Sequence, residues 1–475
     1  MSDLILLFIL LFLVALGVII LITGKRSEKT MRLMGHAGLL DPVEPVDEAR
    51  KEGEAAEQIL DVEDPLDALS WRLKWLNEAE KTVDIAVFEF HKDAAGIDLM
   101  AAIKACADRG VRVRILIDGI CSFYGLFTSP EFKALSAHPC VEVRIYNPIH
   151  IFMPWKMLYR MHDKYMIVDD THFLAGGRNI SSAFLGDYPG RKKGDYDILV
   201  RETEPGRGAA MKSIRAYFQA VWDSLYTRLY RKSDMKPEKL ENGNERLDQY
   251  FIRLKRTYST VYEENGFGAD APWMEAESIF VASNPVDLSF SEPTIMRLVM
   301  SDVLGAKNVL LQSPYFICNA DMWAAMETAA QKVDQLDFIM NSAEGGSNLF
   351  GSSDYMKHKG EILQYGVGIH EYFNKKEALH GKIVLIDDDI SYVGSCNTDV
   401  RSAYIDQEVA LRIRSKELNA RLRSATERLK DHCIYLKAGQ EPVVGKDYTP
   451  GTMSSSRRFA YRLLATCGRP FHDFM

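Results

Sequence analysis

Residues 162–182 read HDKYMIVDDTHFLAGGRNISS, and residues 380–400 read HGKIVLIDDDISYVGSCNTDV. A His, a Lys, an Asp, a Gly and an Asn of the first stretch recur in the second, each 218 positions further along the chain. One such match arises easily by chance, whereas five matches in register indicate an internal repeat. A period this long excludes a solenoid and predicts two similar domains that each contribute half of one site. The matched pairs are His162/His380, Lys164/Lys382, Asp169/Asp387, Gly176/Gly394 and Asn179/Asn397.

The composition is that of a globular protein with a hydrophobic core. The chain has 475 residues, of which 47% are hydrophobic and 26% charged, and this length suggests two or three domains. The net charge of −8 is local, because residues 41–64 carry ten acidic and only two basic side chains. The rest of the chain is neutral overall. It lacks the basic excess of nucleic-acid-binding proteins but is compatible with an anionic substrate.

The seven cysteines are scattered, and none lies in a CxxC or another metal-type spacing. An odd number of cysteines within apolar runs is typical of buried free thiols in a reducing compartment. The cysteines therefore predict neither a disulfide framework nor a metal site.

The N-terminal region predicts a membrane anchor. Residues 4–22 form an apolar run of 19 residues, nearly long enough as a helix to cross a hydrocarbon core of about 30 Å. A signal peptide is the alternative, but the run follows Met-Ser-Asp rather than a basic segment, and no small-x-small cleavage site follows it. Basic residues come directly after it, at Lys25, Arg26, Lys29 and Arg32. The positive-inside rule then places the downstream chain in the cytoplasm, behind a single-pass anchor in the cell membrane.

Beyond the anchor, residues 24–64 are acidic and poor in aromatic side chains, which predicts a flexible or partly helical tether. Apolar residues at helical spacing then predict a helix over 66–80, and the run TVDIAVFEF predicts a strand over 82–90. A further helix is expected at 98–109, and further strands at 111–117, 141–146, 164–168 and 173–175.

The second half repeats this order, with strands expected at 308–312, 336–340 and 367–372. Strands that alternate with helices predict an α/β fold in which helices cover the sheets. The charged stretch 228–275 is interpreted as a connector. The resulting plan is a transmembrane anchor at 1–23, a tether at 24–64, a first domain at 65–227, a connector at 228–275, a second domain at 276–437 and a C-terminal tail at 438–475.

Each copy of the motif lies on a strand, where alternate residues share a face. His162 and Lys164 therefore point the same way, as do His380 and Lys382. Both side chains of each pair can then reach one phosphate group.

The segment after each strand supplies further polar groups. Gly177 and Ser395 lie in small-residue turns that let the backbone approach closely. Asn179 and Asn397 can donate hydrogen bonds to an anionic oxygen. Two such faces would surround one phosphoryl group with Lys and Asn donors, while one imidazole attacks phosphorus and the other protonates the leaving oxygen.

The repeated HxKxxxxD, followed by GGxN or GSxN, resembles the HKD motif of the phospholipase D superfamily. Other stretches, among them GVRVRILID, SPYF and GSCNTDVRSAYIDQEVAL, are similar to bacterial cardiolipin synthases, and the resemblance covers residues 64–437. It implies two tandem phospholipase D-like domains with mixed sheets flanked by helices and related by a pseudo-two-fold axis. It also implies a phosphohistidine intermediate and neither a metal nor another cofactor.

The same resemblance suggests roles for the motif residues. His162 is expected to be the nucleophile and His380 the general acid and then the general base. Asp169 and Asp387 belong to the catalytic motif and are expected to support its geometry.

Members of the superfamily also carry an acidic residue behind each catalytic histidine. Glu408 fits that position for His380. Asp197 is the candidate for His162, with Asp195 as a close neighbour.

The function implied by the resemblance is that of a membrane-anchored phosphatidyltransferase, most similar to cardiolipin synthase. Its expected partners are the membrane and phospholipid substrates, namely phosphatidylglycerol and also phosphatidylethanolamine, without nucleic acid. Two alternatives stay open, because the motif does not select the acceptor. One is a phospholipase D hydrolase that releases phosphatidic acid, and the other is an HKD-type nuclease.

Two further segments have two interpretations each. Residues 149–159, IHIFMPWKMLY, are either a core or interdomain segment or a lipid-facing lip beside the site. Residues 457–474 are basic and amphipathic, and they form either a packing tail or a helix on the membrane surface.

Overall fold

The computed structural model describes residues 37–44, 46, 54–122, 125–150, 157–230, 237–286, 292–346, 348–459 and 461. The predicted anchor at 4–22 lies outside these residues, as does much of the predicted tether. Within the described part of the chain, no helix is both long and apolar enough to span a membrane.

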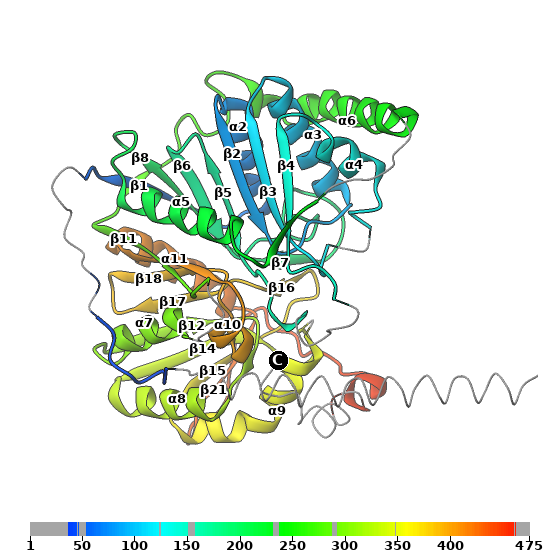
Figure 1. Ribbon diagram of the computed structural model, residues 1–475. Coiled ribbons are helices and arrows are strands. Elements are labelled where there is room, and N and C mark those ends of the chain that lie inside the picture. Colours follow the sequence, from blue (N-terminus) through cyan, green and yellow to red (C-terminus); the bar gives the residue numbers. More distant parts are fainter. Residues whose placement is uncertain are drawn as a thin grey trace, which may run out of the picture.

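The described residues form two mixed sheets with the same strand order, one above the other in Figure 1. The first nine-stranded sheet has the order β10 (Met274–Glu275), β1 (Glu57–Val62), β8 (Asp197–Glu202), β6 (His172–Gly176), β5 (Lys164–Val168), β2 (Thr82–Val87), β3 (Arg112–Asp118), β4 (Val141–Tyr146) and β9 (Thr227–Leu229). We call the part of the chain that builds this sheet and its helices the first domain.

The second sheet belongs to the part of the chain that we call the second domain. Its nine described strands have the order β11 (Ser278–Ser283), β20 (Val409–Arg414), β18 (Ile390–Gly394), β17 (Ile383–Ile386), β12 (Asn308–Gln312), β14 (Gln335–Asn341), β15 (Gly368–Tyr372), β21 (Cys433–Leu436) and β22 (Val443–Val444). In each sheet the motif strand, β5 or β17, pairs antiparallel with the first strand of a parallel trio. The predicted α/β class and the internal repeat are thus confirmed.

Helices cover both sheets on both faces. The outer face of the first sheet packs on α2 (Pro65–Glu78), α3 (Ala94–Asp108), α4 (Pro130–Ser136) and α6 (Pro237–Thr257). The outer face of the second packs on α7 (Thr294–Val303), α8 (Ala320–Lys332) and α9 (Leu349–Gln364). Between the sheets lie α5 (Ala209–Trp222) and α11 (Lys416–Lys430), in a core to which both domains contribute (Figure 1).

Short elements complete the chain and join the domains. A two-stranded parallel ladder links β7 (Lys192–Gly194) of the first domain to β16 (Glu377–Leu379) of the second. In the second domain, β13 (Phe316–Ile317) pairs with β19 (Thr398–Asp399), just before α10 (Val400–Tyr404). A 3₁₀ turn, η2 (Ser259–Tyr262), follows α6.

The structure corrects three boundaries of the predicted domain plan. The tether does not extend to Asp64, because Glu57–Val62 is strand β1, paired along its length with β8. Residues 228–275 are not a connector, because Leu247 and Leu254 bury α6 in the first domain's core and β10 pairs with β1. Part of the predicted tail, Val443–Val444, extends the second sheet.

The structure describes six of the seven cysteines. All six described cysteines are free thiols, and three of them are fully buried. No group of three or more His, Cys, Asp or Glu side chains that could hold a metal ion occurs in the described part of the chain.

Candidate active site

The histidine of the first motif is paired with a carboxylate of the other domain. His162 Nδ1 lies 2.9 Å from Glu408 Oε1, and both groups are buried. Burial would raise the pKa of Glu408, but the hydrogen bond with His162 and the positive charge of Lys164 outweigh it and hold that pKa below its ordinary value. An ionised Glu408 accepts the Nδ1 proton of His162 and leaves Nε2 as the nitrogen available for phosphorus.

The second histidine is paired in the opposite direction across the domain interface. His380 Nδ1 lies 2.5 Å from Asp195 Oδ2. Lys382 and His380 overcome the effect of burial and hold the pKa of Asp195 well below its usual range. Burial, together with the adjacent charge of Lys382, lowers the pKa of His380 to about 3. The imidazole of His380 therefore faces an ionised carboxylate at neutral pH.

These contacts correct the predicted carboxylate partners. Glu408 lies behind His162, not behind His380 as predicted. Asp197, the candidate for His162, pairs with two arginines instead, and the neighbouring Asp195 lies behind His380. The sheet register explains why the partner is Asp195 and not Asp197. Gly176 pairs with Asp197 in the first sheet, and the equivalent Gly394 pairs with Ala410 in the second.

Asp195 lies two residues before Asp197, and Glu408 lies two residues before Ala410, so Asp195 and Glu408 are equivalent. Asp197 has a structural role, since its buried carboxylate lies 2.8 Å from the guanidinium of Arg72 and 3.3 Å from that of Arg178.

Both motif lysines lie at the same site as the histidines. Lys164 Nζ donates to the carbonyl of His162 and lies 5.1 Å from the centre of the Phe88 ring. Lys382 Nζ lies 2.7 Å from His380 Nδ1 and 3.9 Å from Asp195. Burial lowers the pKa of Lys164 and lowers that of Lys382 to about 7. A bound phosphate would compensate this buried positive charge.

The small residues of the motif sit against the neighbouring strand. A side-chain carbon on Gly177 would lie 2.3 Å from Asp195 Oδ1, so only glycine leaves room for that carboxylate. At the equivalent position, the hydroxyl of Ser395 donates to Glu408 instead. Ser402 also donates to Glu408, over 2.6 Å. The small residues that were predicted to let the backbone approach closely therefore lie against the carboxylate behind each histidine.

The two asparagines lie beside the histidines and bond to different partners. Asn179 Nδ2 donates to Glu89 Oε2 over 3.3 Å. Asn397 Nδ2 donates to the hydroxyl of Tyr315 over 3.2 Å. Pattern reasoning missed Glu89 and Tyr315, because neither belongs to the repeated stretch.

The motif aspartates do not reach the reacting groups, which corrects their assignment as catalytic. Asp169 lies five residues beyond Lys164, roughly 16 Å along a strand. Its carboxylate accepts hydrogen bonds from the backbone N–H groups of residues 80, 81 and 82, over 2.7–2.8 Å. Asp387 accepts from Lys307 and Asn308 in the same way, and both aspartates have a positive φ. They join strand ends and form the turn after each motif strand.

We expect Asp169→Ala and Asp387→Ala each to lower the free energy of unfolding by about 2 kcal/mol, because charge-assisted hydrogen bonds to the backbone are lost. Turnover per folded molecule should stay within about threefold of the wild type. Urea unfolding followed by fluorescence, with activity measured well below the midpoint, tests both points. A large loss of turnover at unchanged stability would restore a catalytic role.

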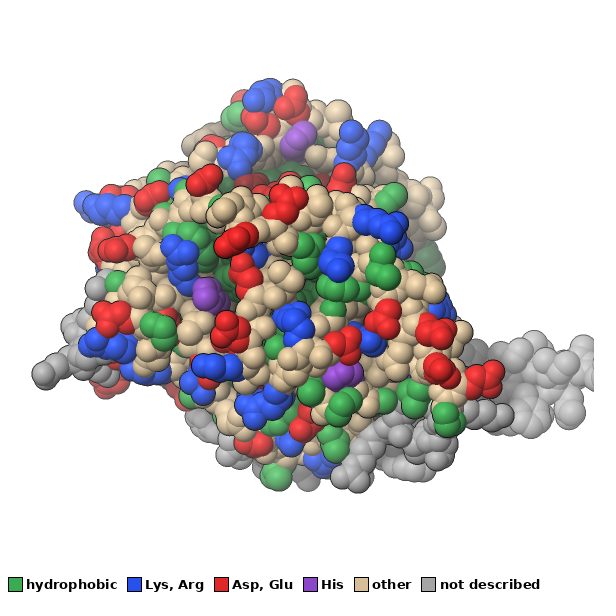
Figure 2. Space-filling model, turned by 90° about the horizontal axis from the view of Figure 1, so that it is seen from above, with side chains coloured by type: hydrophobic (Ala, Val, Ile, Leu, Met, Phe, Trp, Pro, Cys, Tyr) green, Lys and Arg blue, Asp and Glu red, His purple; other side chains and the backbone are tan. Residues whose placement is uncertain are grey.

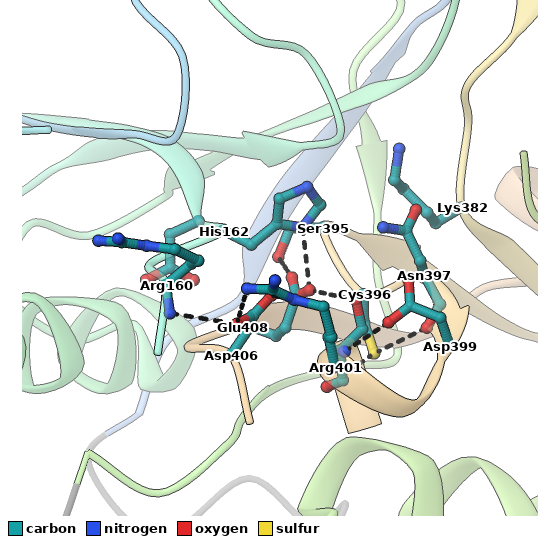
Figure 3. A network of polar contacts seen from close by, with 12 residues as sticks. Arg160, His162, Lys382, Ser395, Cys396, Asn397, Asp399, Arg401, Asp406 and Glu408 are labelled. Atoms are coloured by element: carbon teal, nitrogen blue, oxygen red, sulfur yellow. Dashed lines mark hydrogen bonds and ion pairs between the residues drawn. The ribbon is translucent and has the colours of Figure 1, made fainter. Parts of the chain in front are cut away.

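A set of ion pairs holds the domains in register, and we call Asp118, Arg160, Arg401 and Asp406 the interdomain clasp. Asp118, Arg160 and Asp406 are buried, and Arg401 is partly exposed. Figure 3 shows Arg160, Arg401 and Asp406. Arg160 Nε donates to Asp118 over 2.9 Å, and the Arg160 backbone N–H donates to Asp406 over 3.1 Å. Arg401 donates to Asp406 over 3.0 Å and to the carbonyl of Leu158 over 2.7 Å.

The clasp fixes the contact between His162 and Glu408. The His162 N–H donates to the carbonyl of Gln407 over 2.9 Å, and the Gln407 N–H donates to the carbonyl of Arg160 over 2.8 Å. Residues 160–162 and 406–408 therefore run side by side across the domain interface. In the sequence, RSAYIDQE shows only a set of polar residues inside an apolar stretch, so this contact across the domain interface could not be predicted from it.

The structure describes parts of the two segments, 149–159 and 457–474, that had two interpretations each. Leu158 and Tyr159 pack against the second domain's core, which supports the interdomain interpretation there, whereas Ile149 is 36% exposed. Residues 151–156 lie outside the described residues. From the C-terminal segment, Arg457 and Tyr461 bond to carbonyls of residues 346 and 343, so this part packs on the second domain. Residues 462–475 lie outside the description.

The two halves of the site carry the motif residues in one repeated arrangement, as expected of the family that the motifs resemble. A family model described as "Cardiolipin synthase, PLD-like domain" matches residues 73–222 and 304–430, which together make up more than half of the chain. The chain belongs to this family. The match includes both histidines, both lysines and both of the carboxylates behind them.

Individual relatives are similar at low identity. The chain is 24% identical over 418 residues to an uncharacterized protein of Helicobacter pylori, with 78% of each chain covered. It is 23% identical over 395 residues to cardiolipin synthase C of Escherichia coli, covering 75% of this chain and 81% of that one.

Among solved structures, phosphatidylserine synthase of Haemophilus influenzae superposes with a TM-score of 0.60 at 13% identity. The superposition covers 95% of this chain and 98% of that one. The resemblance of the sequence to phospholipase D-type proteins is thus confirmed at the level of family and fold.

Proposed function

We propose that this protein is a phosphatidyltransferase of the cardiolipin synthase type, held at the cell membrane by a single N-terminal anchor with its catalytic domains in the cytoplasm. The observation that carries the proposal is the pair of motif histidines, each hydrogen-bonded to a buried carboxylate of the opposite domain, with both motif lysines beside them. Membership of the family supports the choice of a phospholipid as substrate.

In the first step, Nε2 of His162 attacks the phosphorus of a bound phospholipid. The bond from phosphorus to the head-group oxygen breaks, and this oxygen takes a proton from His380. Glu408 keeps the Nδ1 proton of His162 in place throughout, which stabilises the positive charge that develops on the ring. Lys164, Lys382 and the two asparagines supply donors for the phosphoryl oxygens.

His380 must hold a proton when the substrate is bound. Its low pKa reflects burial beside Lys382 in the empty site. A phosphate anion placed next to Lys382 offsets that positive charge, and Asp195 favours the imidazolium form. In the second step, His380 removes a proton from the acceptor hydroxyl, whose oxygen displaces His162 from phosphorus.

The acceptor decides between a transferase and a hydrolase. A lipid hydroxyl as acceptor makes a new phosphodiester, whereas water makes phosphatidic acid. An anchor at the bilayer keeps lipid head groups concentrated at the site, which favours transfer. With phosphatidylglycerol as both donor and acceptor, the products are cardiolipin and glycerol.

A nuclease is supported less well. The face shown in Figure 2, nearest α6, carries intermixed acidic and basic side chains rather than a continuous basic surface. The charge of the chain beyond residues 41–64 is neutral overall. Binding to a nucleic-acid backbone relies on an excess of positive charge.

Purified protein incubated with phosphatidylglycerol vesicles should produce cardiolipin and release glycerol in equal amounts, and adding phosphatidylethanolamine should release ethanolamine as well. Because lysine and asparagine donors already face the phosphoryl group, EDTA should leave the rate unchanged within about twofold. Thin-layer chromatography and mass spectrometry identify the products. Phosphatidic acid as the sole lipid product would make the protein a hydrolase, and cleavage of single-stranded nucleic acid without lipid turnover would make it a nuclease.

A further inference from the structure

The internal repeat extends beyond the motif to a pair of residues that differ in chemistry. Phe90 forms a parallel bridge to Ile180, and Phe316 pairs in the same way with Thr398. Since Ile180 and Thr398 are 218 positions apart, Phe90 and Phe316 are equivalent. The residues before them, Glu89 and Tyr315, therefore occupy the same place in the two halves.

The contacts of Glu89 and Tyr315 confirm this equivalence. Glu89 accepts a hydrogen bond from Asn179, and the Tyr315 hydroxyl accepts one from Asn397, which is the matching asparagine of the second motif. One half of the site thus presents a carboxylate where the other half presents a phenol. The pseudo-two-fold axis relates the backbone but not this pair of side chains.

Glu89 lies at the active site, because Asn179 donates to it and the preceding residue, Phe88, packs its ring against that of His162, with 4.6 Å between the ring centres. Burial would raise its pKa, but His91, Lys164 and His380 around it hold the pKa below its ordinary value, so the carboxylate is ionised. Its side chain is 32% exposed. Oε2 is engaged by Asn179 and by His91, at 3.3 and 3.2 Å. Among the described side chains, none donates a hydrogen bond to Oε1.

An ionised, partly exposed carboxylate beside a phosphodiester site repels the phosphate itself. It stabilises instead a neighbouring part of the substrate that carries hydrogen-bond donors. The chain of two or three carbons in a phospholipid head group places its terminal donors a few ångströms beyond phosphorus.

We propose that Glu89 is the head-group recognition residue of this enzyme and that its Oε1 accepts hydrogen bonds from a head group with terminal donors. Such donors are the hydroxyls of glycerol or the ammonium of ethanolamine. The proposal rests on the proposed phosphatidyltransferase function and adds its specificity. Phosphatidylcholine, whose quaternary ammonium has no N–H, is the head group that this arrangement disfavours.

The test compares Glu89→Gln and Glu89→Ala with Tyr315→Phe, the matched variant on the other half. Head-group release is measured as kcat/KM from vesicles of phosphatidylglycerol, phosphatidylethanolamine or phosphatidylcholine. Loss of a charge-assisted hydrogen bond should lower kcat/KM for the donor-bearing head group by about ten- to a hundredfold in Glu89→Ala. The rate with phosphatidylcholine should change by less than about threefold, whereas Tyr315→Phe should change all three rates by a similar factor.

The glutamine variant distinguishes the ammonium of ethanolamine from the hydroxyls of glycerol as the donor. It removes the negative charge but keeps an oxygen acceptor, so an ammonium ligand should lose most of its affinity and a glycerol ligand only part of it. An equal loss for all three lipids in Glu89→Ala would show that Glu89 only holds Asn179 in place and would overturn the proposal. If the wild-type protein releases no head group from any lipid, the proposed function itself fails, and that result precedes any comparison of variants.

Discussion

Replacing either His162 or His380 with alanine is expected to lower turnover on the order of 10⁴-fold. Each imidazole performs a step that the other cannot perform, since one forms the bond to phosphorus and the other moves the proton. The carboxylates that orient them come from opposite domains, so neither half has a spare pair. Head-group release from labelled phospholipid measures the effect.

The intermediate can be located by rapid acid-free quenching of the wild type with a substrate labelled at phosphorus, followed by peptide mapping. Label is expected on His162, and label on His380 would reverse the two roles. His138→Gln is a suitable control, because His138 pairs with Asp108 at the far end of the first domain and should leave turnover unchanged. Substantial activity in both single alanine variants would contradict one shared site.

The largest effect on stability is expected from Asp406→Ala in the interdomain clasp. Asp406 is buried and accepts from Arg401 and from the backbone of Arg160. Removing it leaves the Arg401 guanidinium without its carboxylate at the interface, which costs about 3–5 kcal/mol. Turnover of the remaining folded protein should also fall, because residues 406–408 position Glu408 behind His162.

Asp302→Ala provides the matched control for that variant. Asp302 pairs with Arg412 over 2.7 Å and accepts from the Tyr392 hydroxyl inside the second domain, and it contacts none of the motif histidines, lysines or asparagines. It should lower the free energy of unfolding while leaving turnover per folded molecule near the wild-type value. Urea unfolding and activity measured on the same samples compare the two variants. Equal turnover in both would mean that the clasp does not position the catalytic pair.

Local pattern predicted most of the strands that build the sheets. Strands expected at 141–146, 164–168 and 308–312 have these bounds in the structure, because β-branched and apolar residues are dense there. Strand β1 was missed because it follows an acidic, strand-poor stretch and gains its stability from pairing with β8. Helix α6 was interpreted as a connector because few apolar residues mark its buried face.

The site was predictable where it repeats and unpredictable where it crosses between domains. A fixed offset identified the histidines, lysines and asparagines. The carboxylates could not be assigned, because His162 and Glu408 are 246 residues apart and His380 and Asp195 are 185 apart. A residue near a histidine in the sequence was expected to be its partner, whereas the domain interface exchanges the partners.

This exchange of carboxylates makes activity conditional on the completion of synthesis. A nascent chain that has emerged from the ribosome only as far as the first domain contains His162 and Lys164 but not Glu408. Its imidazole then has no fixed tautomer and no counter-charge. The chain gains a competent nucleophile only after the segment around Glu408 has been translated and docked. Under the proposed function, a partly made or proteolytically truncated copy that lacks Glu408 is therefore inactive.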